Sequence, residues 1–129
     1  MKITLSYKND AHRKLCIKKD LIELSQWIDT IENINAEFDH LKLIEKQLIQ
    51  NNTIRIHLQG LRRKNTLVMG SFCQYEQELR KEFIYGKQEY DLARAKEHEK
   101  RRDHYSVLIH EFRKLKRIIY ENLSKYHRR

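Results

Sequence analysis

Asp20 to Leu48 has the sequence DLIELSQWIDTIENINAEFDHLKLIEKQL. Large apolar side chains recur in it at intervals of three and four residues, and only Glu45 interrupts the series. This spacing is typical of a helix that buries one narrow stripe, because a half-buried strand would alternate at every second residue. The series consists of Trp27, Ile31, Ile34, Phe38, Leu41 and Leu48. We therefore predict a long amphipathic helix that begins near Asp20, with Asp20 as its N-cap.

The rest of the chain continues the same pattern. A second series contains Leu58, Leu61, Asn65, Val68, Phe72, Tyr75, Leu79, Phe83, Gly86, Tyr90 and Ala93, and a third contains Leu108, Phe112, Leu115, Ile119 and Tyr126. The 129 residues include no proline and only three glycines, whereas average composition would give roughly six prolines. Since these residues usually interrupt helices, we predict an all-α fold. It is a long antiparallel helical hairpin, similar to a coiled coil, or alternatively an elongated three-helix bundle.

Two segments are candidates for the turn of the hairpin, because each offers Asn for a helix end and Thr for the next N-cap. They are Asn-Asn-Thr at 51–53 and Lys-Asn-Thr at 64–66. The regular spacing of apolar residues is interrupted between Leu48 and Leu58, which favours a turn in the first segment. Arms of more equal length and the cations before Asn65 favour the second, which we prefer. A turn at Asn65 would place Trp27 beside Asp103.

Two further regions leave the architecture open. Residues 96–104 contain no apolar side chain, so they form either a solvated part of a long helix or a bend in which Asp103 caps a third helix. Residues 1–19 alternate apolar and polar side chains at their start, as a short strand would, but nothing else in the chain resembles a strand. We predict a basic N-terminal arm over 1–19 that packs loosely on a helical domain over 20–129.

Charge is distributed unevenly along the chain, whose net charge is +9. Residues 1–19 contain six basic residues and one acidic residue, 20–60 contain three basic and seven acidic, and 61–129 contain eighteen basic and ten acidic. An acidic helix followed by a basic one favours their antiparallel pairing.

Several functional classes lack the residues that they would need. No apolar run approaches the roughly 18 residues of a membrane-spanning helix, and the start lacks the apolar stretch of a secretory signal. The two cysteines, Cys16 and Cys73, have no spacing typical of a disulfide framework. We expect a cytoplasmic protein in which Cys73, next to the apolar Phe72, is buried and unreactive and does not pair with Cys16.

One segment has the spacing of a metal-binding motif. Glu37 to His40 is an E-x-x-H, as used twice in di-iron helical bundles together with two further carboxylates. The motif occurs here only once, so we predict no metal and no cofactor. No nucleophile–base arrangement or phosphate-binding loop stands out either, and we predict that the chain is not an enzyme and has no small-molecule substrate.

Clusters of Lys and Arg near both termini are the feature that points most directly to a partner. If a hairpin closes, these clusters meet at one end of the rod, where their repulsion is relieved by solvent or by an anionic partner. An acidic protein, nucleic acid and a membrane surface all match this chemistry, and so does a basic end that is merely solvated. The candidate residues are Arg13, Lys14, Lys18, Lys19, Arg113, Lys114, Lys116 and Arg117.

Apolar residues beside the main series predict contacts with a further helix, from a second copy or a different protein. They are Leu43, Ile44, Ile84 and Ile118. The sequence thus favours a non-enzymatic helical protein-interaction module, such as an adaptor, scaffold or small assembly subunit, with a basic terminal end. The alternative is a nucleic-acid-associated accessory protein that contacts the phosphate backbone non-specifically.

Overall fold

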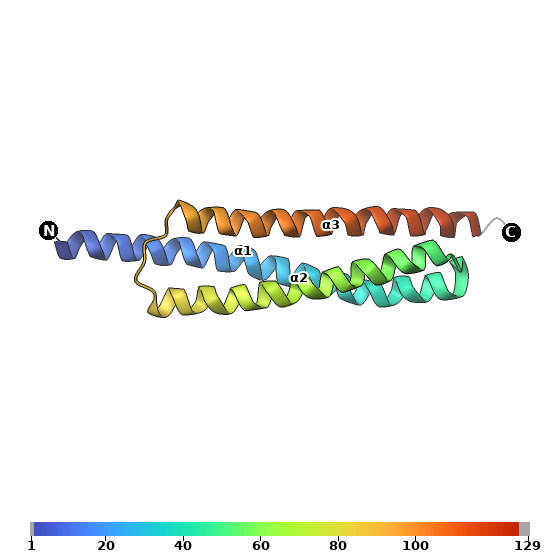
Figure 1. The fold of residues 1–129 in the computed structure, drawn as a ribbon, viewed down its shortest axis with the longest axis horizontal. Helices are drawn as coiled ribbons and strands as arrows, with labels where there is room; N and C mark the ends of the chain where they lie inside the picture. The colour runs from blue at the N-terminus through green and yellow to red at the C-terminus, as the bar shows by residue number, and fades with distance from the viewer. Residues whose placement is uncertain (1, 127–129) are drawn as a thin grey trace.

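The computed structural model describes the backbone of residues 2–126 and the side chains of residues 8–125. This part of the chain forms three long helices, α1 (Lys2–Ile44), α2 (Asn52–Tyr85) and α3 (Leu92–Tyr126), and contains no strand. Figure 1 shows α1 and α2 as an antiparallel pair, with α3 returning alongside them in the direction of α1. The all-α prediction is confirmed, and the architecture is the elongated three-helix bundle.

The first helix begins earlier than the sequence pattern indicated. Residues 2–19, expected to form a loose arm, are the first turns of α1, and Asp20 therefore lies within a helix rather than at its N-cap. Ile17 and Arg13 continue the buried stripe of α1 upstream of Asp20, which explains why the helix extends that far. The first turns of α1 project beyond the loop that joins α2 to α3 (Figure 1).

The chain turns for the first time at Gln50 and Asn51, so the predicted turn at Asn65 is wrong. Asn65 lies inside α2 and is buried. The turn begins with a short π-helical segment, η1 (Glu45–Ile49), followed by Gln50 in the left-handed region with φ of 52°. The backbone N–H of Gln50 donates to the Glu45 carbonyl oxygen at 2.7 Å. This bond closes the end of η1 in the manner of other left-handed C-caps.

Polar groups at this turn explain why it forms here. Asn51 caps α2 by accepting a hydrogen bond from the Ile54 N–H at 3.1 Å. The buried Glu45 carboxylate accepts bonds from the Asn51 N–H at 3.2 Å and from Arg55 Nε at 2.8 Å. The residue that interrupts the apolar series is thus the one that holds the turn, because its carboxylate satisfies donors at the N-terminus of α2.

The second turn lies at 86–91, before the stretch 96–104 that was the candidate bend. Residues 96–104 are part of α3. Gly86 follows α2 and donates its N–H to the Glu82 carbonyl at 3.0 Å. A Cβ at this glycine would lie 2.5 Å from that carbonyl oxygen, so a larger residue would displace the helix end. The Asp91 carboxylate then caps α3 by accepting the Arg94 N–H at 3.0 Å.

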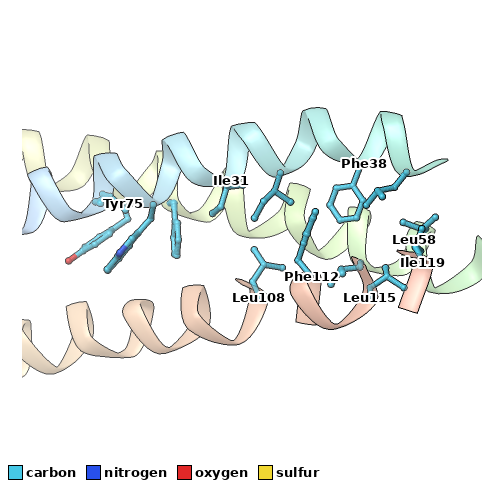
Figure 2. Close-up of a cluster of buried hydrophobic side chains, with 14 of the residues drawn as sticks. Ile31, Phe38, Leu58, Tyr75, Leu108, Phe112, Leu115 and Ile119 are labelled. Atoms are coloured by element: carbon cyan, nitrogen blue, oxygen red, sulfur yellow. The ribbon is translucent and has the colours of Figure 1, made fainter. Parts of the chain in front are cut away.

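A single apolar core runs along the bundle and contains most members of the three predicted apolar series. Its members are Ile17, Leu24, Trp27, Ile31, Ile34, Phe38 and Leu41 of α1, Ile54, Leu58, Leu61, Phe72, Tyr75 and Leu79 of α2, and Leu108, Phe112, Leu115 and Ile119 of α3. Leu48 and Ala93 are exposed, Gly86 and Tyr90 lie in the second turn, and Tyr126 lies outside the residues whose side chains the structure describes. Figure 2 shows Phe38 of α1 facing Phe112 of α3, with Leu115 and Ile119 continuing the row and Tyr75 at its far end. None of the described helices carries an apolar stretch long enough to cross a membrane.

Candidate functional site

The two basic clusters do not meet, contrary to the prediction for a closed hairpin. Because α3 runs parallel to α1, residues 113–117 lie beside Phe38, whereas residues 13–19 lie beside the end of α2 (Figure 1). The separation is about 20 residues along α1, or roughly 30 Å at the helical rise. The second turn is responsible, since it reverses the direction in which the C-terminal segment runs.

The N-terminal cluster divides into structural and exposed residues. Arg13 is only 3% exposed and donates hydrogen bonds to the Glu82 carbonyl and to the Asp10 carboxylate. It therefore terminates α2 instead of offering its charge to a partner. Lys14 lies 3.6 Å from Asp10. Lys18 and Lys19 point outward and are exposed.

The C-terminal cluster divides in the same way. Lys116 Nζ lies 2.7 Å from the Glu37 carboxylate of α1, and this hydrogen bond raises the pKa of the lysine. Arg113, Lys114 and Arg117 are exposed and take part in none of the ion pairs found among the described residues. A basic face of three residues remains on the outside of α3.

The four predicted packing residues also differ in their surroundings. Ile44 and Ile118 are partly buried against the core of this same chain, so their packing inside the bundle accounts for part of their apolar surface. Leu43 and Ile84 are exposed by 52% and 64%. They lie on α1 and α2, near opposite ends of the bundle.

The outer side of α1 exposes apolar and basic groups side by side near the N-terminal end. Leu15 is 68% exposed and Ile22 is 55% exposed. They are seven residues apart, which places them on one side of the helix, two turns from each other. Lys18 and Lys19 lie one turn from both. We call Leu15, Lys18, Lys19 and Ile22 the α1 outer face.

A polar cluster, buried at Asp20, Tyr75 and His98, joins all three helices near the same end. We call it the α1–α3 polar cluster, and its members are Asp20, Glu23, Tyr75, Tyr90, His98 and Arg102. His98, 2% exposed, places Nε2 at 2.7 Å from Glu23 Oε1 and 3.5 Å from Asp20 Oδ1. Its other nitrogen, Nδ1, lies 2.8 Å from the Tyr75 hydroxyl. The imidazole therefore has a polar partner on each side.

The outer oxygens of both carboxylates are held by further groups. Arg102 donates through Nε to Glu23 Oε2 and through Nη2 to Glu23 Oε1, both at 2.7 Å. The Tyr90 hydroxyl donates to Asp20 Oδ2. Trp27 stacks on the His98 ring, with centroids 5.1 Å apart and planes 23° from parallel. The ring orientation is thus fixed by packing as well as by hydrogen bonds.

The ionisation of the cluster follows from these contacts. The hydrogen bond from Arg102, reinforced by one from His98, lowers the pKa of Glu23 to about 2, although partial burial opposes the shift. Burial raises the pKa of the Tyr75 hydroxyl, and the nearby Asp20 charge adds to the effect. Burial also raises the pKa of Tyr90, together with its hydrogen bond to Asp20. At neutral pH the carboxylate of Glu23 is charged and both phenols keep their protons.

A surface hollow of about 730 Å³ lies against one side of the cluster. Asp20, Tyr75 and Tyr90 contribute to its lining, along with residues from the end of α2 and the start of α3. Buried polar side chains of the cluster therefore border a space that a small molecule or ion can enter.

Sequence reasoning did not find this cluster, since its members come from four separate places in the chain: residues 20–23, 75, 90 and 98–102. The E-x-x-H segment from Glu37 to His40 is not part of the α1–α3 polar cluster. Glu37 pairs with Lys116, and His40 is exposed. Cys73 is exposed, which corrects the prediction of a buried thiol, while both cysteines are unpaired as expected.

No protein-family model, curated protein or solved structure matches this chain.

Proposed function

We propose that this chain is a non-enzymatic helical interaction module, and that the α1 outer face docks an acidic amphipathic helix of a partner protein. The exposure of Leu15 and Ile22 carries this proposal. Two large aliphatic side chains two turns apart form the kind of stripe that an amphipathic helix covers with its own apolar residues.

The positive charge of the α1 outer face indicates that the partner helix is acidic. Lys18 and Lys19 lie between Leu15 and Ile22 on the same side of α1 and are exposed. Exposed basic residues beside an apolar stripe attract acidic side chains and disfavour basic ones, and so select among partner helices. The unpaired thiols agree with a reducing cytoplasm as the compartment.

A pair of synthetic peptides tests the proposal. The acidic probe is an amphipathic helix with leucines on one face and glutamates beside them, and the basic probe replaces every glutamate with lysine. Fluorescence anisotropy at low and moderate salt should show binding of the acidic probe alone. The double variant Leu15→Ser/Ile22→Ser should weaken it at least about tenfold, because it removes roughly 2 kcal/mol or more of apolar contact.

The matched control is Leu67→Ser, which removes an equally exposed leucine (69%) from α2 and should leave binding unchanged. Both sets of substitutions are at exposed positions, so each should change the free energy of unfolding by less than about 0.5 kcal/mol. Failure of the acidic probe to bind, or equal weakening by the control, would overturn the proposal.

Generic duplex DNA provides the contrast with the alternative function. The basic face of Arg113, Lys114 and Arg117 favours phosphate contacts, whose strength falls steeply with salt. DNA binding that is abolished by Arg113→Glu/Arg117→Glu, together with no binding of the acidic peptide, would replace the proposed function with the nucleic-acid-associated one.

A further inference from the structure

We infer that Asp20, Glu23 and His98 form a binding site for a divalent first-row transition metal such as Zn²⁺. The inference does not depend on the proposed function. One ligand atom from each residue, Nε2 of His98, Oδ1 of Asp20 and one carboxylate oxygen of Glu23, lies within 4.8 Å of the other two. Imidazole nitrogen and carboxylate oxygen are ligands that zinc accepts in tetrahedral sites.

The distances between the donors are close to those that the ion requires. Metal–ligand bonds of 2.0–2.2 Å in a tetrahedral site separate the ligand atoms by about 3.3–3.5 Å. His98 Nε2 and Asp20 Oδ1 are already 3.5 Å apart. Nε2 and Glu23 Oε1 are 2.7 Å apart, so the Glu23 carboxylate has to move outward by less than about 1 Å. Glu23 is the least buried of the three and lies toward the surface beside Arg102.

Each candidate ligand is held from behind by a second residue. Tyr75 contacts Nδ1 of His98, Tyr90 donates to Oδ2 of Asp20, and Arg102 donates to Oε2 of Glu23. Nε2, Oδ1 and Oε1 face one another, and Oε1 also accepts a hydrogen bond from Arg102 Nη2 at 2.7 Å, which the ion has to displace or share. Partners of this kind orient the ligands of metal sites and fix the histidine tautomer. For Nε2 to bind the ion, the proton that His98 shares with Glu23 has to leave, and the remaining ring proton has to lie on Nδ1, where the Tyr75 hydroxyl oxygen accepts it.

Charge and access also fit a bound cation. Two carboxylates face the site, and Arg102 compensates only one of them, so a divalent ion leaves the site with a small net charge. Three protein ligands leave one coordination position open. Of the three candidate ligands, Asp20 lines the hollow, together with Tyr75 and Tyr90, so the ion and a water ligand would approach the site past Asp20.

Calorimetric titration of the whole chain with ZnCl₂, after removal of metals by a chelator, tests the site. The titration uses a Cys16→Ser background, because Cys16 Sγ lies 3.6 Å from His12 Nε2 and this exposed pair is a competing ligand. We expect one equivalent of zinc to bind, and the thermal unfolding midpoint to rise with zinc concentration, since the ion binds the folded state. Cobalt(II) in place of zinc should give visible absorption typical of four ligands.

Adding His98→Gln should abolish saturable binding, and adding Tyr75→Phe should weaken it about tenfold or more. His40→Gln, which removes an exposed histidine of α1, is the matched control and should bind as the background does. Circular dichroism checks that each variant folds. If His98→Gln does not fold, Asp20→Asn takes its place, since Asn retains an oxygen for Tyr90. No saturable binding in the background, or equal binding after loss of His98 or Asp20, would overturn the inference.

Discussion

The two halves of the core are built from different chemistry. Around Phe38 and Phe112, whose ring centroids are 5.2 Å apart, α3 is held by apolar side chains. Around Trp27 and His98, α3 is held by the α1–α3 polar cluster as much as by packing. Apolar contact depends on the area buried and tolerates small shifts, whereas buried polar groups stabilise only the arrangement that satisfies all of them. We therefore expect the apolar half to contribute more to the free energy of unfolding, and the polar half to specify how α3 is placed.

The largest expected effect is in the apolar half. Phe112→Ala should lower the free energy of unfolding by about 3–5 kcal/mol, because it removes a buried ring and leaves a cavity against Phe38. Urea denaturation followed by circular dichroism measures the change. The control is Tyr120→Ala on the exposed side of α3, which should cost less than about 0.5 kcal/mol. Similar losses at the two positions would contradict the description of this half as the main source of stability.

In the polar half, a single substitution should lower the free energy of unfolding more than a paired substitution does. His98→Leu should cost about 1–3 kcal/mol in metal-free protein, because it leaves the Asp20 carboxylate and the Tyr75 hydroxyl with fewer partners. Adding Asp20→Leu should recover part of the loss, because it removes the buried carboxylate that lost its partner, although it also removes the acceptor of the Tyr90 hydroxyl. His104→Leu, at an exposed position of the same helix, is the control. A double variant that is less stable than His98→Leu would show that the polar contacts themselves stabilise the fold.

Asn65 is a polar exception within the series of α2, and it offers a gain in stability. It is 1% exposed, and its Oδ1 atom has no hydrogen-bond partner among the described residues. Asn65→Leu should therefore raise the free energy of unfolding by about 1–2 kcal/mol. A buried Asn in a helical seam also restricts register and oligomeric state, so sedimentation should accompany denaturation. Gln74→Leu, on the exposed side of α2, should give no such gain, and a loss at Asn65 would refute the expectation.

The smallest expected change in the free energy of unfolding comes from the ion pair between Arg102 and Glu23, at the edge of the polar half. Arg102→Gln should cost about 0.5–1 kcal/mol at neutral pH, since both partners are partly exposed. The pKa of Glu23 is about 2 in the folded protein against an ordinary 4.5. Because the folded value is the lower one, the contribution is present above pH 4.5 and is lost as the pH falls toward 2.

Denaturation of the wild type and Arg102→Gln between pH 7 and pH 2 measures this contribution. The difference between the two proteins should shrink through that interval. Arg113→Gln serves as the control, since Arg113 is exposed on the outer side of α3, and its difference from the wild type should stay small at every pH. A difference for Arg102→Gln that does not depend on pH would mean that Glu23 is not the group concerned.

The spacing of apolar residues predicted the core but did not predict where the polar and charged residues lie. The apolar period identified most core residues of the three helices, because burial on one side of a helix requires apolar residues at regular intervals in the sequence. The same period could not distinguish Arg13, which is buried and caps α2, from Lys18 and Lys19, which are exposed. It also gave no reason to group Asp20 with His98, since that contact depends on the direction in which α3 runs.

The sequence by itself determined the all-helical fold, the buried stripes and the absence of helix breakers within them, since these follow from the spacing of side chains along a helix. It also contained Glu45, the one break in the first series, although its meaning was not evident. Only the tertiary structure decided that the chain turns at Gln50 and again after Tyr85. Those two turns depend on long-range and capping contacts, such as Arg13 with the Glu82 carbonyl, and they set α3 parallel to α1. That direction separates the basic clusters and brings His98 to Asp20 and Glu23.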